Sequence, residues 1–583
     1  MTNASTTEAK PWPALTLAEA HAVMTAPGAQ FEMEEVSIRG VPTRVWKNAP
    51  ATLRDIFLAG RAHGDKTFLV YEDDRASFES FSRAALAFAH ALLQEGVKKG
   101  DRVAVAMRNL PEWPVAFFGA ALTGAIVTPI NAWGQGAELE YALNDSGAKV
   151  AVVDSERLDR LAPHLANCGA LQRVYVTRDE RAHADARVQR LESLLGAVND
   201  WGRLPDRPLP DVAIAADDDA TIFYTSGTTG AQKGALGTQR CTGTTVYAGV
   251  FSGQRAFVRK GEPVPDPAAR ALQRATLVAI PFFHTTGCQA TLSGALFNGS
   301  KIVTMHHWNV EQAMGLIERE QITAAGGVPT IAWQILEHPN REQYNLSTIE
   351  GIAYGGAPAS AELVRRIKQV FPSASPGSGW GMTETSATFT HHSGEDYVRR
   401  PDSAGPSIPV GELRIVSEQG EVLPSGEVGE LWAKGPHVVK GYWNKPEVTA
   451  ETFTDGWVKT GDLAYLDDEG WLYIVDRKKD MLIRGGENIY CTEVEGVLYE
   501  HPAVMDASVV GLPHKQLGEE PAAAVTLKVG AEASEEELRA FVGERLARFK
   551  VPVRVLVLRE TLPRNANGKI MKKEVKAMLL DAA

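Results

Sequence analysis

A short run rich in hydroxyls and glycines has the groups needed to hold a phosphate chain. It contains Thr225, Ser226, Gly227, Thr228, Thr229, Gly230 and Lys233. Glycine lets backbone N–H groups approach an anion, the hydroxyls add donors, and the lysine adds positive charge. The apolar, β-prone residues 220–224 come directly before it, so we expect the loop to leave the end of a strand, where α/β folds bind nucleotides. The run lacks the Walker spacing, and taken alone it is equally compatible with an ordinary turn.

Further segments follow this run in a fixed order. They are residues 354–358 (Tyr-Gly-Gly-Ala-Pro), 379–385 (Gly-Trp-Gly-Met-Thr-Glu-Thr), 457–463, 473–480, 485–489 and 563–569. Together they resemble the acyl-adenylate-forming superfamily, which includes acyl-CoA synthetases, luciferases and the adenylation domains of peptide synthetases. The resemblance extends from about Thr221 to Lys569. It implies that a carboxylate attacks the α-phosphorus of ATP with the help of Mg²⁺, and that coenzyme A then accepts the acyl group.

The resemblance also implies roles for individual residues. Lys569 corresponds to the adenylation lysine, which offsets the charge that builds up between the carboxylate and the α-phosphate. Glu384, together with Thr383, is the candidate for holding the metal, because Mg²⁺ prefers hard oxygen ligands. The loop 225–230 and Lys233 would hold the β- and γ-phosphates, although Gln232 stands where a proline is common.

The remaining parts of the nucleotide are assigned in the same way. The adenine and ribose contacts are expected from Gly355, Gly356, Ala357, Pro358, Trp380, Gly381, Met382, Asp462, Arg477 and Asn488. Trp380 replaces the usual tyrosine that stacks on adenine. Asp462 has the carboxylate needed to accept hydrogen bonds from two vicinal ribose hydroxyls.

The acyl group is expected to bind beside the segment 281–287. The predicted pocket residues are Phe283, His284, Thr285, Gly287 and Tyr354. His284 stands where amino-acid-activating relatives carry an aspartate for the substrate ammonium, which favours an acid without an α-amine. A medium- or long-chain fatty acid is therefore the leading substrate, with a cinnamate- or benzoate-like acid, or transfer to a carrier protein, as alternatives. A non-catalytic nucleotide sensor is disfavoured because the charged residues are all present.

Two segments near the C-terminus are expected to govern a second half-reaction. By resemblance Lys479 is the hinge of a mobile lid, and Gly485 and Gly486 border the path of the coenzyme A thiol. Side-chain chemistry alone would not separate Lys479 from its neighbour Lys478. We expect the lid to adopt two orientations, because one arrangement cannot serve both reactions at the same carbonyl.

Composition narrows the class of protein. The chain has 583 residues, 44% of them apolar and 23% charged, with a formal net charge of −12, which argues against a nucleic-acid partner. No apolar run is long enough to cross a bilayer. The four cysteines have neither metal nor redox spacing and the N-terminus lacks a secretory signal, so a reduced cytoplasmic protein is expected. A homodimer is left open.

Strand and helix patterns alternate along the chain, which predicts an α/β fold with two doubly wound sheets. Helices are expected at 78–96, 113–122, 310–319 and 361–370, and strands at 103–107, 125–128, 149–154, 276–280 and 324–328. Short β-like runs over roughly 411–476 predict a small distorted barrel. We expect residues 1–478 to form a large domain with an extension at 1–40, and residues 479–583 to form a smaller α+β lid.

Overall fold

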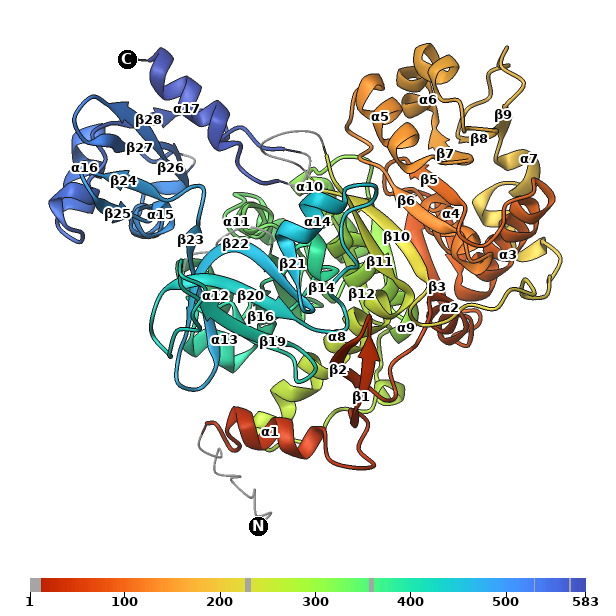
Figure 1. Ribbon diagram of the computed structural model, residues 1–583, viewed down its shortest axis with the longest axis horizontal. Helices are drawn as coiled ribbons and strands as arrows, with labels where there is room; N and C mark the ends of the chain where they lie inside the picture. The colour runs from red at the N-terminus through yellow and green to blue at the C-terminus, as the bar shows by residue number, and fades with distance from the viewer. Residues whose placement is uncertain (1–11, 226–231, 356–360, 529, 566–567, 583) are drawn as a thin grey trace.

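The computed structural model describes residues 12–225, 232–355, 361–528, 530–565 and 568–582. Two large sheets lie side by side, a third, smaller sheet packs next to them, and a fourth sheet belongs to the C-terminal lid (Figure 1). The helices are α1 Leu17–Met24, α2 Leu53–Arg61, α3 Phe78–Gln94, α4 Glu112–Leu122, α5 Gly136–Ser146, α6 Ser155–Leu161, α7 Glu192–Leu195, α8 Gln239–Lys260, α9 Ser293–Asn298, α10 Val310–Arg319, α11 Pro329–Leu336, α12 Ala361–Val370, α13 Glu395–Arg399, α14 Pro446–Thr452, α15 Cys491–Glu500, α16 Glu535–Gly543 and α17 Lys572–Asp581.

The first sheet has seven strands and is covered on both faces. Its order is β11 (Gly234–Thr238), β10 (Asp219–Tyr224), β6 (Ile126–Pro129), β5 (Arg102–Ala106), β7 (Val150–Asp154), β8 (Arg173–Thr177) and β9 (Val188–Arg190), all parallel except the β10–β11 pair. Alternate residues of β5 point to opposite faces: Val103 and Val105 join the core beneath α3 and α4, whereas Ala104 and Ala106 join the core beneath α5 and α6. Burial on both faces explains why these strands are continuously apolar.

The second sheet has eight strands and includes a pair from the beginning of the chain. Its order is β17 (His392–Ser393), β16 (Ser375–Gly379), β15 (Gly351–Gly355), β14 (Ala324–Gly327), β12 (Ala275–Val278), β13 (Lys301–Thr304), β3 (Thr67–Tyr71) and β4 (Asp74–Ser77). Helices α10, α11 and α12 cover one face with a common apolar core. The predicted α/β class with doubly wound sheets is therefore confirmed, and the expected helices and strands are present with shifts of a few residues at their ends.

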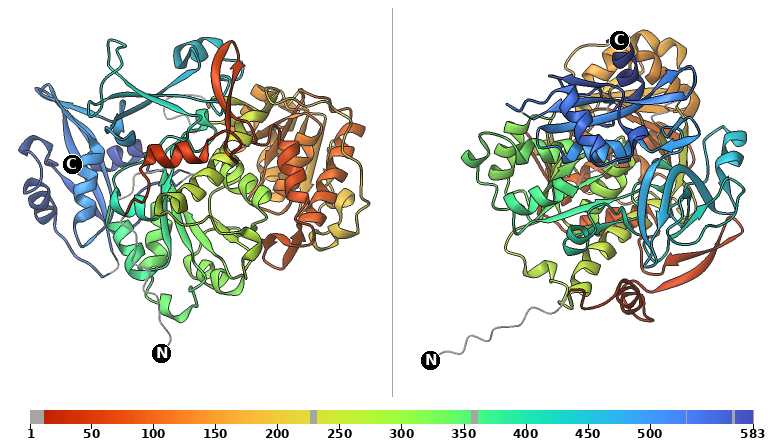
Figure 2. Two further views of the ribbon diagram at one scale, coloured as in Figure 1. Left: turned by 90° about the horizontal axis from the view of Figure 1, so that it is seen from below. Right: turned by 90° about the vertical axis from the view of Figure 1, so that its left-hand side faces the viewer.

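The two remaining sheets follow one another in the chain. The third contains β18 (Gly405–Pro406), β23 (Trp471–Arg477), β22 (Trp457–Leu466), β20 (Gly429–Lys434) and β19 (Glu412–Val416), with β21 (Phe453–Thr454) beside β22. The lid sheet contains β25 (Glu487–Ile489), β24 (Leu482–Arg484), β27 (Gly518–Leu527) and β26 (Val504–His514), with β28 (Val555–Leu558) beside β27. The chain passes from one sheet to the other between Arg477 and Leu482. In the left view of Figure 2 the lid and the seven-stranded sheet lie at opposite ends of the molecule, with the other sheets between them.

The N-terminal segment is anchored on the long helix α8. The hairpin of β1 (Met33–Ile38) and β2 (Val41–Trp46) contributes Trp46 to an aromatic cluster with Phe31, Tyr247 and Phe251. Residues 1–11 of the predicted extension lie outside the described residues. Within the described part of the chain, no helix is long and apolar enough to span a membrane.

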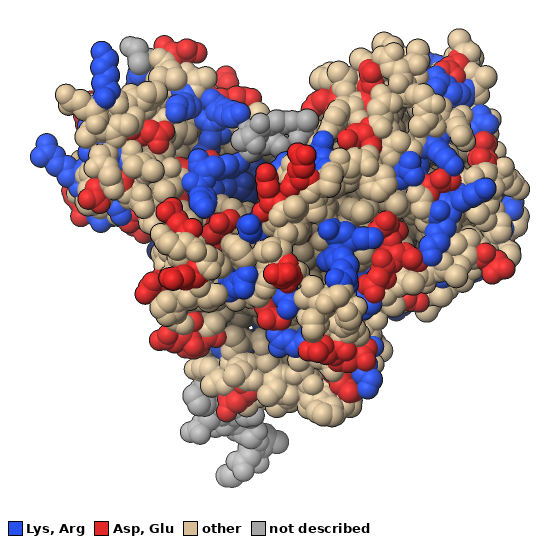
Figure 3. Space-filling model, in the orientation of Figure 1, with Lys and Arg blue, Asp and Glu red and all other residues tan. Residues whose placement is uncertain are grey.

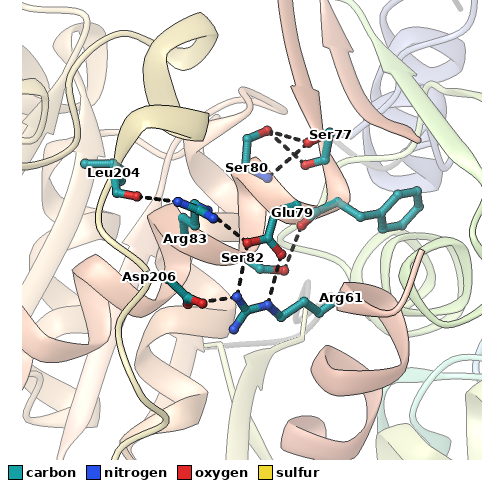
Figure 4. Close-up of polar contacts among 9 residues, drawn as sticks. Arg61, Ser77, Glu79, Ser80, Ser82, Arg83, Leu204 and Asp206 are labelled. Atoms are coloured by element: carbon teal, nitrogen blue, oxygen red, sulfur yellow. Dashed lines mark hydrogen bonds and ion pairs between the residues drawn. The ribbon is translucent and has the colours of Figure 1, made fainter. Parts of the chain in front are cut away.

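An ion-pair network fixes α2 against α3 (Figure 4). Arg61 binds Glu79 at 3.0 Å and Asp206 at 2.8 Å, and Glu79 also accepts from Arg83 at 2.8 Å. Arg83 donates to the carbonyl of Leu204. A network of partly buried charges holds its geometry better than isolated surface pairs do, so it ties the 204–206 segment to the first sheet.

Candidate active site

Lys569 lies between the lid and the large domain. It follows Gly568, whose φ of +73° is in the left-handed region, and a Cβ at Gly568 would lie 3.1 Å from Cγ2 of Val328 in the large domain. Burial lowers the pKa of the Lys569 ammonium to about 8, with Arg477 and Lys479 adding to the shift and Asp462 and Glu384 opposing it. These interactions place the lysine within electrostatic reach of residues that the sequence analysis assigned to ATP and Mg²⁺.

Glu384 is buried and held by a tyrosine. It lies in a short 3₁₀ turn, Thr383–Thr385, with Thr383 beside it and partly exposed, and its Oε1 accepts a hydrogen bond of 2.6 Å from the Tyr442 hydroxyl. The Lys233 ammonium lies 4.9 Å from the centre of the Tyr442 ring, a cation–π contact. The Tyr442 ring therefore links the metal candidate to the lysine of the phosphate loop.

The backbone around Glu384 adopts conformations that side chains rarely tolerate. A Cβ at Gly381 would lie 1.6 Å from the Ala387 carbonyl oxygen, so only glycine fits there. Ser386 and Ala387 have φ values of 54° and 86°, which are uncommon for residues with side chains. Such strain persists when the surroundings fix it, and it often marks functional sites. Here the Ser386 carbonyl accepts from Thr245 of α8 at 2.8 Å.

The ribose candidates form a second connected group. Asp462 on β22 accepts a hydrogen bond of 2.7 Å from the Trp380 indole and lies 3.4 Å from the Arg477 guanidinium at the end of β23. Asp462 and Arg477 are directly opposite in the β22–β23 register, which explains how residues of two motifs meet. Trp380 and Met382 are partly buried at the end of β16, and Met382 donates its N–H to Thr385.

The phosphate loop is described only at its ends. Ser226, Gly227, Thr228, Thr229 and Gly230 lie outside the described residues, as do Gly356, Ala357 and Pro358. Thr225 follows the end of β10, as predicted, and its N–H donates to the Lys233 carbonyl at 2.8 Å. The loop therefore joins the antiparallel strands β10 and β11, paired at Tyr224 and Gly234. Gly355, at the end of β15, pairs with Gly379 at the end of β16.

The acyl segment is shaped mainly by close backbone contacts. Phe283 and Thr285 are buried, and the His284 ring lies 5.4 Å from the Phe283 ring. Gly287 is the second residue of a π-helix, Thr286–Leu292, and a Cβ there would lie 2.1 Å from the Pro281 carbonyl oxygen. This approach requires glycine and fixes the turn that presents His284 and Thr285.

Two predicted site side chains lie apart from the groups described above. Tyr354 packs in the core beneath α11 and α12, with its ring 6.0 Å from that of Tyr397, whereas its neighbour Ala353 is exposed on the opposite face of the sheet. Strand alternation therefore turns the Tyr354 side chain away from the face on which it was expected. Asn488 is exposed on β25 of the lid and is not part of the Trp380–Asp462–Arg477 group.

The hinge and thiol-path candidates lie where the chain passes from the third sheet to the lid sheet. Lys479 is in the turn after β23, and burial lowers the pKa of its ammonium. Gly485 and Gly486 form the tight turn of the β24–β25 hairpin with φ values of 60° and 91°, and both are exposed. Positive φ at both turn positions is typical of a type I′ hairpin and explains the glycine pair.

Tyr442 is the residue that sequence reasoning missed. It lies 58 residues from Glu384 in the chain, in the segment Lys440-Gly441-Tyr442-Trp443, and no charge or spacing points to it. Gly441, with φ of 147° and close to Thr449, positions the tyrosine. In the sequence, the only signal was a glycine, Gly441, directly before two aromatic residues.

The groups that gather here are suited to polyphosphate chemistry. Lysine and arginine side chains collect on the side of the lid that borders the hollow between it and the seven-stranded sheet (Figure 3). The Lys569 ammonium interacts electrostatically with the carboxylates of Glu384 and Asp462. Residues 57–443 match the family model of the AMP-binding enzyme, and residues 493–569 match that of the AMP-binding enzyme C-terminal domain. The chain belongs to the AMP-binding enzyme family.

Curated relatives of this chain are named for different acids. A long-chain-fatty-acid–CoA ligase from Bacillus subtilis is 33% identical over 88% of this chain and 91% of its own. A feruloyl-CoA synthase from Amycolatopsis sp is also 33% identical, over 86% of this chain and 93% of its own. The o-succinylbenzoate CoA synthetase from Bacillus subtilis, solved with its acyl-adenylate, has a TM-score of 0.72 at 29% identity, covering 89% of this chain and 97% of that one. The chain is therefore an adenylate-forming acyl-CoA synthetase by family, and its relatives leave the acid open.

Proposed function

We propose that this enzyme activates a medium- or long-chain fatty acid as its acyl-adenylate and then forms the coenzyme A thioester, releasing AMP and pyrophosphate. The observation that carries the chemistry is the convergence of Lys569 with Glu384 and Asp462 across the domain boundary. ATP, Mg²⁺ and coenzyme A complete the reaction, as related synthetases are solved with ATP and magnesium or with acyl-adenylate.

The residues divide the work of the first step. The Lys569 ammonium offsets negative charge between the attacking carboxylate and the α-phosphate, while Asp462 orients the ribose. The buried Glu384 carboxylate, fixed by Tyr442, fits a hard cation, and Thr383 lies beside it. Bound Mg²⁺ would neutralise phosphate charge. Lys233 supplies a fixed charge for the terminal phosphates.

Support for a fatty acid comes from the acyl segment. His284 follows the buried Phe283 in place of an ammonium-binding aspartate, so the segment offers apolar surface and no fixed negative charge. The second candidate is an aryl acid, favoured by the feruloyl-CoA synthases at the same identity. A third candidate function keeps the adenylate but transfers the acyl group to a carrier protein in place of coenzyme A.

A panel of fatty, aryl and amino acids distinguishes these functions. We expect acid-dependent pyrophosphate release and thioester formation with fatty acids, weaker turnover with cinnamate-like acids and none with amino acids. A several-fold higher kcat/KM for a cinnamate-like acid than for every fatty acid would replace the leading proposal with the aryl one. Adenylate formation without thioester would favour a carrier protein.

We further propose that Lys479 is the hinge between residues 1–478 and 479–583. Lys479→Pro fixes φ and removes a backbone donor, so it should spare adenylation and slow thioester formation at least tenfold. Lys478→Pro is the control at the neighbouring position. It removes the hydrogen bond of 2.9 Å from the Lys478 N–H to the Gly461 carbonyl, so it serves as a control only if the thermal midpoint is unchanged. Equal slowing of both half-reactions by Lys479→Pro would exclude the hinge.

The cysteines bear on the cellular location of the enzyme. All four cysteines are unpaired and buried, which supports a reducing cytoplasmic location. Size-exclusion chromatography with light scattering would determine whether the enzyme forms a homodimer.

A further inference from the structure

The start of helix α11 lies against the lid. Its N-cap residue, Val328, contacts Gly568 beside the adenylation lysine. This short helix therefore borders the loop that carries Lys569.

A second contact joins the same helix to the lid. The Lys528 ammonium, at the end of β27, lies 5.4 Å from the centre of the Trp333 ring on α11. Trp333 is only 8% exposed and belongs to the core beneath the eight-stranded sheet, so the ring is a rigid platform. Lys528 is partly buried, and among the described residues it has no ion pair that would compete for its charge.

Two contacts define an orientation better than one. Val328 and Trp333 are five residues apart, which separates them by about 7.5 Å along the helix. With the Gly568 contact alone the lid could pivot about that point, whereas a second contact at Trp333 removes this freedom. A cation over a desolvated tryptophan face is among the stronger contacts of its kind.

We propose that Lys528 is a positioning residue for adenylation, whose ammonium docks on Trp333 and holds the lid where Lys569 reaches the α-phosphate. This inference rests on the proposed function, since it assigns the contact to the first of its two half-reactions. The contact joins the lid to α11 of the large domain, so a lid rotation that admits the thiol would break it. Its loss therefore slows the first half-reaction and spares the second.

The test separates the half-reactions in full-length variants. Lys528→Gln should lower acid-dependent ATP–pyrophosphate exchange about fivefold, which corresponds to the loss of a cation–π contact of about 1 kcal/mol. Thioester formation from supplied acyl-adenylate should stay within twofold of wild type. Lys528→Arg keeps a cation for the ring and should restore exchange. Lys515→Gln removes the same charge from an exposed lid position and should change neither rate.

The partner residue gives an independent check. Trp333→Leu combined with Lys528→Gln should be no slower in exchange than the worse single variant, because each removes the same contact. Trp333→Phe, which keeps a ring in the core, replaces it if Trp333→Leu fails to fold. Additive losses, equal slowing of both half-reactions, or an effect of Lys515→Gln matching that of Lys528→Gln would overturn the proposal. Absence of exchange in the wild-type enzyme with every acid would instead refute the proposed function.

Discussion

The proposed nucleotide side and the proposed acyl side of the site are built by different means. On the nucleotide side, charged and polar groups are fixed by direct bonds, as in the 2.6 Å contact of Tyr442 with Glu384 and the 2.7 Å contact of Trp380 with Asp462. On the acyl side, shape comes from buried Phe283 and from the close approach of Gly287 to the Pro281 carbonyl. Charge recognition demands particular residues, whereas shape can be produced by many. We therefore expect the acyl side to vary more readily than the nucleotide side.

The largest effect should come from the lysine that serves both sides. Lys569→Ala removes a charge aimed at the transition state and should slow adenylation on the order of 10²–10³-fold with every acid. Thioester formation from supplied acyl-adenylate should remain within a few-fold of wild type. Single-turnover assays of each half-reaction measure this. An unchanged exchange rate would assign the charge to another residue.

A substitution on the acyl side should affect the use of the acid and leave the binding of ATP unchanged. Gly287→Ala places a methyl group against the Pro281 carbonyl and must displace the turn that carries His284 and Thr285. We expect kcat/KM for the acid to fall about tenfold, as small misplacements of a substrate are costly. The KM for ATP should stay within twofold.

Gly294→Ala is the matched control, because a Cβ there meets nothing within 4 Å. A thermal melt of both variants separates misfolding from a changed pocket. Equal changes in ATP and acid parameters for Gly287→Ala would show that the two sides are not independent.

The smallest effect should come from the tyrosine behind the metal candidate. Tyr442→Phe keeps the ring near Lys233 but leaves the buried Glu384 carboxylate without one donor, and we expect a roughly fivefold loss of exchange rate. The Mg²⁺ concentration for half-maximal rate should rise. Tyr465→Phe, in a stacked pair 4.8 Å from Tyr473, is the control. A normal Mg²⁺ titration would leave Tyr442 with a packing role only.

Sequence patterns predicted what local chemistry determines. The helix of residues 78–96 and the strand of residues 103–107 appear as α3 and β5, because burial periodicity is a local property. The pairing of β3 with β13, Leu69 opposite Ile302, could not be foreseen, since it depends on tertiary packing across the chain.

The same limit applies within the site. Motif residues such as Glu384, Asp462 and Lys569 were identified from their segments, whereas the Tyr442 contact depends on how the third sheet docks. The motif that contains Tyr354 gives residue order but not the face of β15 on which the side chain lies. The position of Asn488 depends on the orientation of the lid, so its nucleotide contact stays a prediction.

The most direct test of the account is the pH dependence of adenylation in wild type and in Lys569→Arg. Burial lowers the pKa of Lys569 to about 8, so its positive charge is present below that pH and is lost as the pH rises through it. Wild-type kcat/KM for ATP in pyrophosphate exchange should therefore fall above pH 8. The arginine variant should be slower but flat over this range, because a guanidinium stays protonated. An identical alkaline fall in both enzymes, or none in wild type, would contradict delivery of a protonated Lys569 to the α-phosphate.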